Sequence, residues 1–178
     1  MEHSSYVKFF EDMTKAHKDL RHEEPGEQYP SRKRKSFFRA NGQEELVQDS
    51  RTQVDMPYLL LRDYTGRLDT ADDMRVDDIM TGSFEIRKKV DNAYDWAGID
   101  TARDICKKIG MAIIAEMHRL MLDEGHCGPI NDFDLRTVRY DLVGPIIDNH
   151  YGWRVAFTYK NEAYNVNSVD LDTEFQRT

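Results

Sequence analysis

The chain has 178 residues, of which 39% are apolar and 33% charged, a composition typical of one globular domain with long solvated loops or tails. Its net charge of −8, from 25 basic and 33 acidic residues, argues against an ordinary nucleic-acid-binding protein, which needs a basic surface to displace counterions from phosphates. Two cysteines make no disulfide framework, and no apolar run approaches the ~20 residues that cross a bilayer, so we expect a reducing compartment, no membrane span and no secretory signal.

The N-terminal segment predicts an amphipathic helix. Apolar residues from Tyr6 to Leu20 recur at three- and four-residue spacing, and the helix is expected to close at His22. Ser4 or Ser5 can cap its start, since a hydroxyl accepts a hydrogen bond from the first backbone N–H groups. Two prolines and a glycine then predict a long loop over 23–35.

Three strands are predicted before the middle of the chain. They are KSFFRA (35–40), MPYLLLRDY (56–64) and IMTGSFEIRKKV (79–90), the last with Gly82 as a candidate bulge. GQEELVQDS (42–50) favours one or two helical turns. The polar segment 65–78 is expected to be a long loop because it is rich in aspartate and contains a glycine.

The second half predicts a long helix followed by a β-hairpin. The helix, 100–124, carries one broad apolar stripe, with Asp100 as N-cap and Gly125 as its stop, and would be roughly 36 Å long. The strands 133–144 and 150–159 both alternate apolar and polar residues and lie close enough in sequence to pair in antiparallel fashion.

In HYGWRVAFTY (150–159) the alternation separates two faces of a strand. Trp153, Val155, Phe157 and Tyr159 would share the core face, and Arg154, Ala156, Thr158 and Lys160 the other. Together the elements predict an α+β fold with a mostly antiparallel sheet of four to five strands and both helices on one face. Residues 1–160 would form a single domain, and 161–178 a C-terminal arm or tail.

No catalytic, cofactor-binding or metal site is expected. The sulfur and imidazole ligands Cys106, His118, His126 and Cys127 lack the compact spacing of zinc sites. Nucleophile elbows and phosphate-binding loops are absent, and no spacing selects a general acid and base among the many carboxylates. A small soluble enzyme with dispersed carboxylates and histidines remains an alternative, as does an accessory protein that binds a partner through an exposed edge strand.

Two oppositely charged segments are candidates for contacts between subunits. The five aspartates lack the spacing of an EF-hand, so they favour a solvated acidic loop. The basic run at 32–35 is short and favours a loop that touches an acidic neighbour. We hypothesise that the two segments complement each other between copies; the residues are Asp69, Asp72, Asp73, Asp77 and Asp78 on one side and Arg32, Lys33, Arg34 and Lys35 on the other.

The order of these pieces resembles the tail-completion proteins of tailed bacteriophages and prophages, of the tail-terminator type. The likeness spans roughly residues 6–160 and includes the first helix ending in LRH, the strand FFR and the strand MPYLLLRDY. Its most specific block is DFDLRTVRYDLVGPIIDNHYGWRVAFTY (132–159), with the patterns F-D-L-x-x-V and Y-G-x-R-x-x-F-T.

The resemblance implies a structural protein of the virion without enzymatic activity. Such subunits form a ring, usually a hexamer, that caps the tail tube, ends its polymerisation and joins the tail to the neck, while DNA only passes through the lumen. The implied partners are further copies of the chain, the tail tube protein and neck or connector proteins, with no membrane. The protein would be made in the host bacterial cytoplasm and act at the tail–neck junction. On this reading Arg154 and Lys160 are candidates for partner contacts, and a head-completion or neck connector protein is the alternative.

Overall fold

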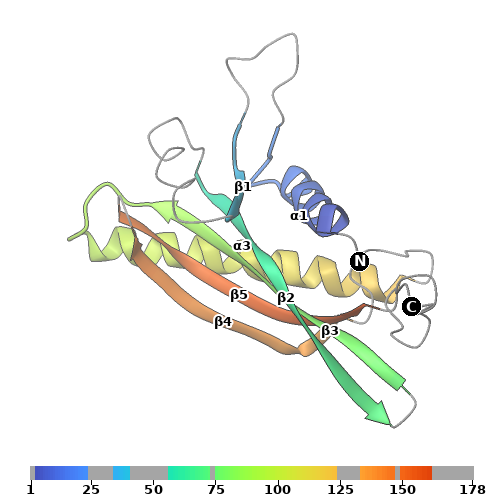
Figure 1. The fold of residues 1–178 in the computed structure, drawn as a ribbon. Coiled ribbons are helices and arrows are strands. Elements are labelled where there is room, and N and C mark those ends of the chain that lie inside the picture. Colours follow the sequence, from blue (N-terminus) through green and yellow to red (C-terminus); the bar gives the residue numbers. More distant parts are fainter. Residues whose placement is uncertain are drawn as a thin grey trace, which may run out of the picture.

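The computed structural model describes residues 3–23, 34–40, 56–72, 75–123, 133–146 and 149–161, with their side chains except at 70–72, 75–77 and 161. In this part of the chain a five-stranded, mostly antiparallel sheet carries two helices on one face, so the predicted α+β class is confirmed (Figure 1). In chain order the elements are α1 (His3–Ala16), β1 (Phe37–Ala40), β2 (Tyr58–Asp72), β3 (Arg75–Lys89), α3 (Trp96–Leu122), β4 (Asp134–Ile146) and β5 (His150–Asn161). The helical turns predicted over 42–50, the arm beyond Asn161 and most of the loop 23–35 lie outside the described residues.

The strands follow the order β1-β2-β3-β5-β4. Only the short pair β1 and β2 is parallel, from Phe37 opposite Leu59 to Ala40 opposite Arg62. The predicted antiparallel pairing of the last two strands is confirmed, since β4 pairs with β5. Within the described residues β4 has no second neighbour and therefore forms one edge of the sheet.

β2 and β3 form a hairpin of two 15-residue strands. Its ladder runs from Tyr58 opposite Arg87 to Asp72 opposite Arg75. The loop predicted over 65–78 is therefore wrong, because all of this segment except 73–74 belongs to the outer half of the hairpin, which extends away from the body of the molecule (Figure 1). Aspartate and glycine are poor strand formers, but cross-strand pairing decides strand formation more strongly than intrinsic preference does.

α3 is a 27-residue helix that packs on β3 and β5. The predicted N-cap Asp100 is wrong, because the helix begins at Trp96 and Asp95 caps it, accepting a hydrogen bond from the Gly98 N–H at 3.0 Å. The sequence pattern missed this first turn because its largest side chain, Trp96, is 69% exposed and adds nothing to the apolar stripe. The predicted stop, Gly125, lies outside the described residues, and the helix ends at Leu122.

α1 is shorter than predicted, since it ends at Ala16 and a turn follows. Leu20 is nevertheless fully buried, and its carbonyl accepts a hydrogen bond from the Ser36 hydroxyl at 2.9 Å. The end of the first helical segment is thus tied to the residue just before β1.

The core fills the space between the sheet and the two helices. Aromatic rings connect the layers: Phe10 of α1 lies 5.5 Å from Phe84 of β3 and 5.7 Å from Phe157 of β5, measured between ring centroids. Edge-to-face and tilted ring pairs of this kind stabilise a core beyond their buried area alone. The fully buried large side chains of this layer are Tyr6, Phe10, Leu20, Leu59, Phe84, Ile86, Ile109, Ile113, Phe157 and Tyr159.

Gly82 lies inside the regular β3–β5 ladder, opposite Phe157, but in the β2–β3 ladder it lies at a register shift, so the irregularity predicted at Gly82 is present on its β2 side. At this shift Asp63 and Tyr64 of β2 stand opposite the single residue Gly82, so the extra residue belongs to β2, and a second shift lies between Thr70 and Asp72. The reason for a glycine is space, because a Cβ atom at position 82 would lie 2.8 Å from both the Phe157 ring and the Tyr6 hydroxyl.

Candidate functional site

The second face of the sheet, opposite the helices, carries four interacting charged side chains. We call Arg62, Glu85, Arg87 and Arg154 the Glu85 cluster. Glu85 and Arg87 lie two residues apart on β3, so strand alternation places them on the same face. Arg154 of β5 is the register partner of Glu85, and Arg62 reaches it from β2. Residues from three strands thus converge on one carboxylate.

Both oxygens of Glu85 accept hydrogen bonds from guanidinium groups. Oε1 accepts from Arg62 Nε at 2.6 Å and from Arg154 Nε at 2.9 Å. Oε2 accepts from Arg87 Nε at 2.7 Å and also from Arg87 Nη2. Three positive charges face one negative charge, so the cluster carries a surplus of two positive charges in a protein whose overall charge is negative.

Glu85 stays ionised although it is fully buried. Burial raises the pKa of its carboxyl, but the charge of Arg87, the hydrogen bonds from Arg87 and Arg154, and the charge of Arg62 together hold the pKa below its ordinary value. Arginine does not lose its proton in proteins. The cluster can therefore bind and position charged groups but offers no group that exchanges protons near neutral pH.

Aromatic side chains enclose the inner end of the cluster. Tyr58 contacts the Arg87 guanidinium through a hydrogen bond, and its ring lies 5.7 Å from that of His150 and 5.4 Å from that of Phe38. Burial raises the pKa of the Tyr58 hydroxyl, so it remains a neutral hydrogen-bonding group. The Arg87 side chain is only 4% exposed, whereas those of Arg62 and Arg154 are 39% and 43% exposed. Arg87 is therefore a buried partner that holds Glu85 in place, and the side chains of Arg62 and Arg154 reach the surface.

A second candidate surface is the edge strand β4, with exposed apolar side chains at Leu135, Tyr140 and Leu142. Their exposed fractions are 46%, 47% and 53%. Soluble proteins usually protect a sheet edge, since its unpaired backbone groups are a template for another chain. Apolar side chains along such an edge indicate an interaction surface.

A cation–aromatic stack connects α3 with the edge strand β4. Lys107 Nζ lies 5.1 Å from the ring centroid of Tyr140 and 5.0 Å from that of Trp153, and the two rings pack edge to face at 5.5 Å. Trp153 Nε1 is buried and has no hydrogen-bond acceptor among the described residues. This stack orients Tyr140, so part of the exposed edge is held in place by the body of the protein.

The predicted basic run is only partly described. Arg32 and Lys33 lie outside the described residues. Arg34 donates hydrogen bonds to the carbonyls of Asp19 at 2.7 Å and Met56 at 3.2 Å, which ties the segment before β1 to its neighbours. Lys35 is exposed and lies 5.0 Å from the Phe38 ring centroid.

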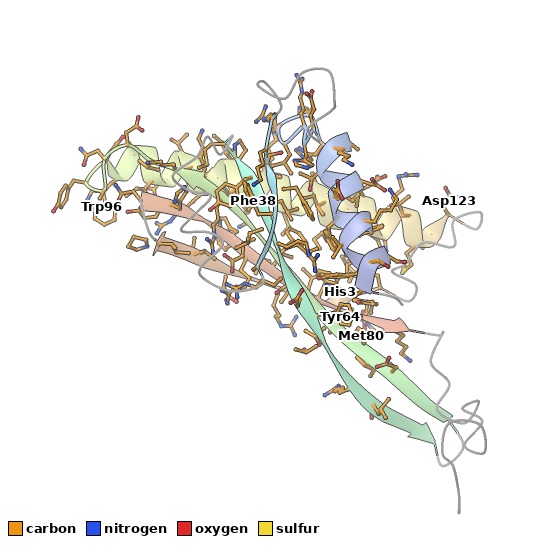
Figure 2. The ribbon with its side chains drawn as sticks, turned by 45° about the horizontal axis from the view of Figure 1, so that its top comes forward. His3, Phe38, Tyr64, Met80, Trp96 and Asp123 are labelled. Carbon is orange, nitrogen blue, oxygen red and sulfur yellow. The ribbon has the colours of Figure 1, made fainter. Side chains whose placement is uncertain are left out.

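Four of the five predicted acidic residues, Asp69, Asp72, Asp77 and Asp78, lie on the outer half of the β2–β3 hairpin. Asp69 is exposed, 3.8 Å from Arg67, and Asp78 is half-buried. For Asp72 and Asp77 the structure describes only the strand backbone, and Asp73 lies outside the described residues. Figure 2 labels Tyr64 and Met80, which lie near the point where this outer half leaves the body.

Arg154 and Lys160, predicted to lie away from the core, do occupy the second face of β5, by alternation with the buried Val155, Phe157 and Tyr159. Arg154 belongs to the Glu85 cluster, and Lys160 is half-buried near the outer end of β5. The structure does not bring these two residues into one site.

The thiol of Cys106 lies in the core on α3, where burial raises its pKa to about 12, so the thiol stays protonated near neutral pH. His118 is half-buried on the same helix, and His126 and Cys127 lie outside the described residues. Among the described residues no group of three or more His, Cys, Asp or Glu side chains is arranged to hold a metal ion.

Sequence reasoning missed Glu85, Arg87 and Arg62 as site residues. In the predicted strand 79–90 Glu85 and Arg87 are only polar neighbours of the apolar face, and Arg62 lies near the end of the predicted strand 56–64. The available signal was Glu85 and Arg87 alternating with Phe84 and Ile86, which places charges on a face that had to be covered or paired. That signal does not identify the partner strands, which only the sheet order provides.

A comparison of the chain with models of known protein families finds no match, and a comparison with curated proteins finds no significant match. Of the two helices that the structure describes, neither is both long enough and apolar enough to span a bilayer.

Proposed function

We propose that the protein is a structural subunit that assembles with further copies of itself into a ring. The observation that carries this proposal is the edge strand β4, whose apolar side chains Tyr140 and Leu142 are about half exposed beside a free strand edge of the described sheet. Burying such a surface against a neighbour removes apolar area from water and pairs the free backbone edge.

In the virion the ring would cap the phage tail tube, end its polymerisation and join the tail to the neck, as the resemblance to tail-completion proteins implies. The α+β fold with both helices on one face agrees with that expectation. A contact between two different surfaces of identical subunits closes into a ring when the rotation between neighbours allows it, which suits a chain whose two sheet edges differ in length and direction.

The self-assembly is tested with Leu142→Glu, which places a charge on the β4 edge. We expect purified wild-type protein to form a ring-sized oligomer by size-exclusion chromatography with light scattering, and the variant to shift to the monomer. The matched control is Leu122→Glu at the end of α3, where the side chain is 64% exposed. The control should assemble like the wild type, and equal assembly of all three proteins would exclude β4 from the interface.

The virion role is tested with tail tubes assembled from a phage tail tube protein. Wild-type protein should stop tube growth and appear at one tube end by negative-stain electron microscopy, whereas Leu142→Glu should not. A wild-type protein that stays monomeric alone and in the presence of tubes would contradict the proposal. If an antibody against the protein marks the neck and not the tube end in these images, the neck connector alternative is correct.

A further inference from the structure

The Glu85 cluster holds two arginines ready to bind an acidic group from outside. Arg62 donates to Glu85 through Nε, and Arg154 does so through Nε and Nη2. The described residues provide no acceptor for the two Nη groups of Arg62 or for Nη1 of Arg154. Because Glu85 already fixes both guanidiniums, binding a further oxyanion would cost little side-chain entropy.

Asp141 of β4 lies directly opposite Arg154, but the five aspartates of segment 69–78 in the same chain lie too far away to neutralise the charge of the cluster. Segment 69–78 contains five aspartates and one arginine. Asp69 follows Arg62 by seven positions along β2, a span of roughly 23 Å at the rise of a strand. The outer half of the hairpin also points away from the body (Figure 1), so these strand residues lie away from the cluster of their own chain.

We propose that Arg62 and Arg154 bind carboxylates at the outer end of the β2–β3 hairpin of a second copy of the chain. This inference rests on the proposed self-assembly and names one of its contacts. The charges are complementary, with a surplus of two positive charges at the cluster and four negative charges on segment 69–78. Arg154 lies on β5 next to β4, directly opposite Asp141, so a neighbour seated on the β4 edge also lies close to Arg154.

The contact uses two different surfaces, one on each copy, and this property allows a sharp test. The site variant is Arg62→Gln with Arg154→Gln, which keeps the internal pair of Glu85 with Arg87 and therefore the fold. The hairpin variant changes all five aspartates of segment 69–78 to asparagine and touches nothing in the Glu85 cluster. Its control carries the same charge change at five exposed positions elsewhere: Asp12, Asp91, Asp100, Asp104 and Asp123, each to asparagine.

Sedimentation velocity should show that the site variant and the hairpin variant each assemble about tenfold or more weakly than the wild type, and that the control does not. Wild-type assembly should also weaken as salt rises, because these charges lie near the surface. Mixing the two defective variants should give a 1:1 heterodimer, since one keeps an intact hairpin and the other intact arginines.

Two results separate failure of this inference from failure of the proposed function. If the hairpin variant and the folded site variant assemble like the wild type while Leu142→Glu does not, the arginine contact is wrong and the β4 interface stands. If the wild type itself never assembles, the proposed function fails together with this contact. Circular dichroism confirms that each variant is folded before its assembly is compared.

Discussion

A single carboxylate organises the second face of the sheet. Glu85 is fully buried, and its removal would leave three guanidiniums close together without a counter-charge. Arg87 is itself almost fully buried, so water cannot take over the role of the carboxylate there. Breaking a buried ion pair by removing one partner is strongly destabilising for this reason.

We therefore predict that Glu85→Gln lowers the free energy of unfolding by about 3–5 kcal/mol. The measurement is urea denaturation at neutral pH, followed by circular dichroism. The matched control is Glu116→Gln on α3, whose carboxylate pairs with the exposed Arg119 at 2.7 Å and should cost about 0–1 kcal/mol. Equal effects of the two substitutions would show that the Glu85 cluster adds no stability of its own.

The depressed pKa of Glu85 also predicts how this difference changes with pH. A carboxyl whose folded pKa is below its unfolded value of about 4.3 stabilises the fold above that value and loses this contribution as the pH falls through the folded pKa. Glutamine does not titrate. The stability gap between the wild type and Glu85→Gln should thus be full at neutral pH and narrow below about pH 4. If the difference in stability between the wild type and Glu85→Gln grows as the pH falls, the pKa of Glu85 is not lowered in the folded protein.

At the scale of elements, α3 was predicted correctly as a helix, but its first residue was not. The apolar stripe predicted the helix, but the cap lies five positions before the residue that the pattern selected. Asp95 accepts a hydrogen bond from the Gly98 N–H, whereas Asp100 is exposed inside the helix and pairs with Arg103 at 3.6 Å.

We predict that Asp95→Ala lowers the free energy of unfolding by about 1 kcal/mol because it removes the N-cap. Asp100→Ala, the same change five residues later, should cost less than about 0.5 kcal/mol, as expected for a surface substitution. Thermal denaturation of the two variants side by side measures the difference. The reverse order would mean that the helix begins at Asp100 in solution.

The β2–β3 hairpin shows why a strand can escape a sequence pattern. Residues 65–78 contain few apolar side chains because most of this segment lies beyond the core, so the alternation that marks a half-buried strand is missing. What makes these residues strands is the pairing of each backbone with the other, from Thr65 opposite Thr81 to Asp72 opposite Arg75. Backbone pairing leaves little trace in side-chain hydrophobicity.

At the scale of the whole molecule, α1, α3 and the sheet share one core and should open together. Phe157 is 1% exposed and contacts rings of α1, β3 and β5. We predict that Phe157→Ala costs about 3–5 kcal/mol, whereas Trp96→Ala, at a 69% exposed position, changes stability by less than about 0.5 kcal/mol.

Cys106 reports the same opening directly, because its thiol is fully buried and its pKa is raised to about 12. With Cys127 replaced by serine, labelling of Cys106 by a thiol reagent should be slow in the wild type and faster in Phe157→Ala. Rapid labelling of both proteins would show that α3 opens separately from the rest of the core.

The sequence by itself determined the elements that bury an apolar face. The alternation in β5 and the stripe of α3 predicted strand and helix correctly, because burial requires a period of two in a strand and of about 3.6 in a helix. It also determined the α+β class and the two faces of β5, with Phe157 inside and Arg154 outside.

Only the tertiary structure decided the order of the strands, the length of the hairpin and the Glu85 cluster. Glu85 meets Arg62 and Arg154 across 23 and 69 positions of the chain, and no local period encodes such distances. The sequence shows only that apolar and polar residues alternate in β4; the fold leaves Leu135, Tyr140 and Leu142 about half exposed, because β4 lies at the sheet edge where no described element covers Leu142. Local periodicity selects which side of an element is apolar, and the packing of distant elements decides which of those sides is left for a partner.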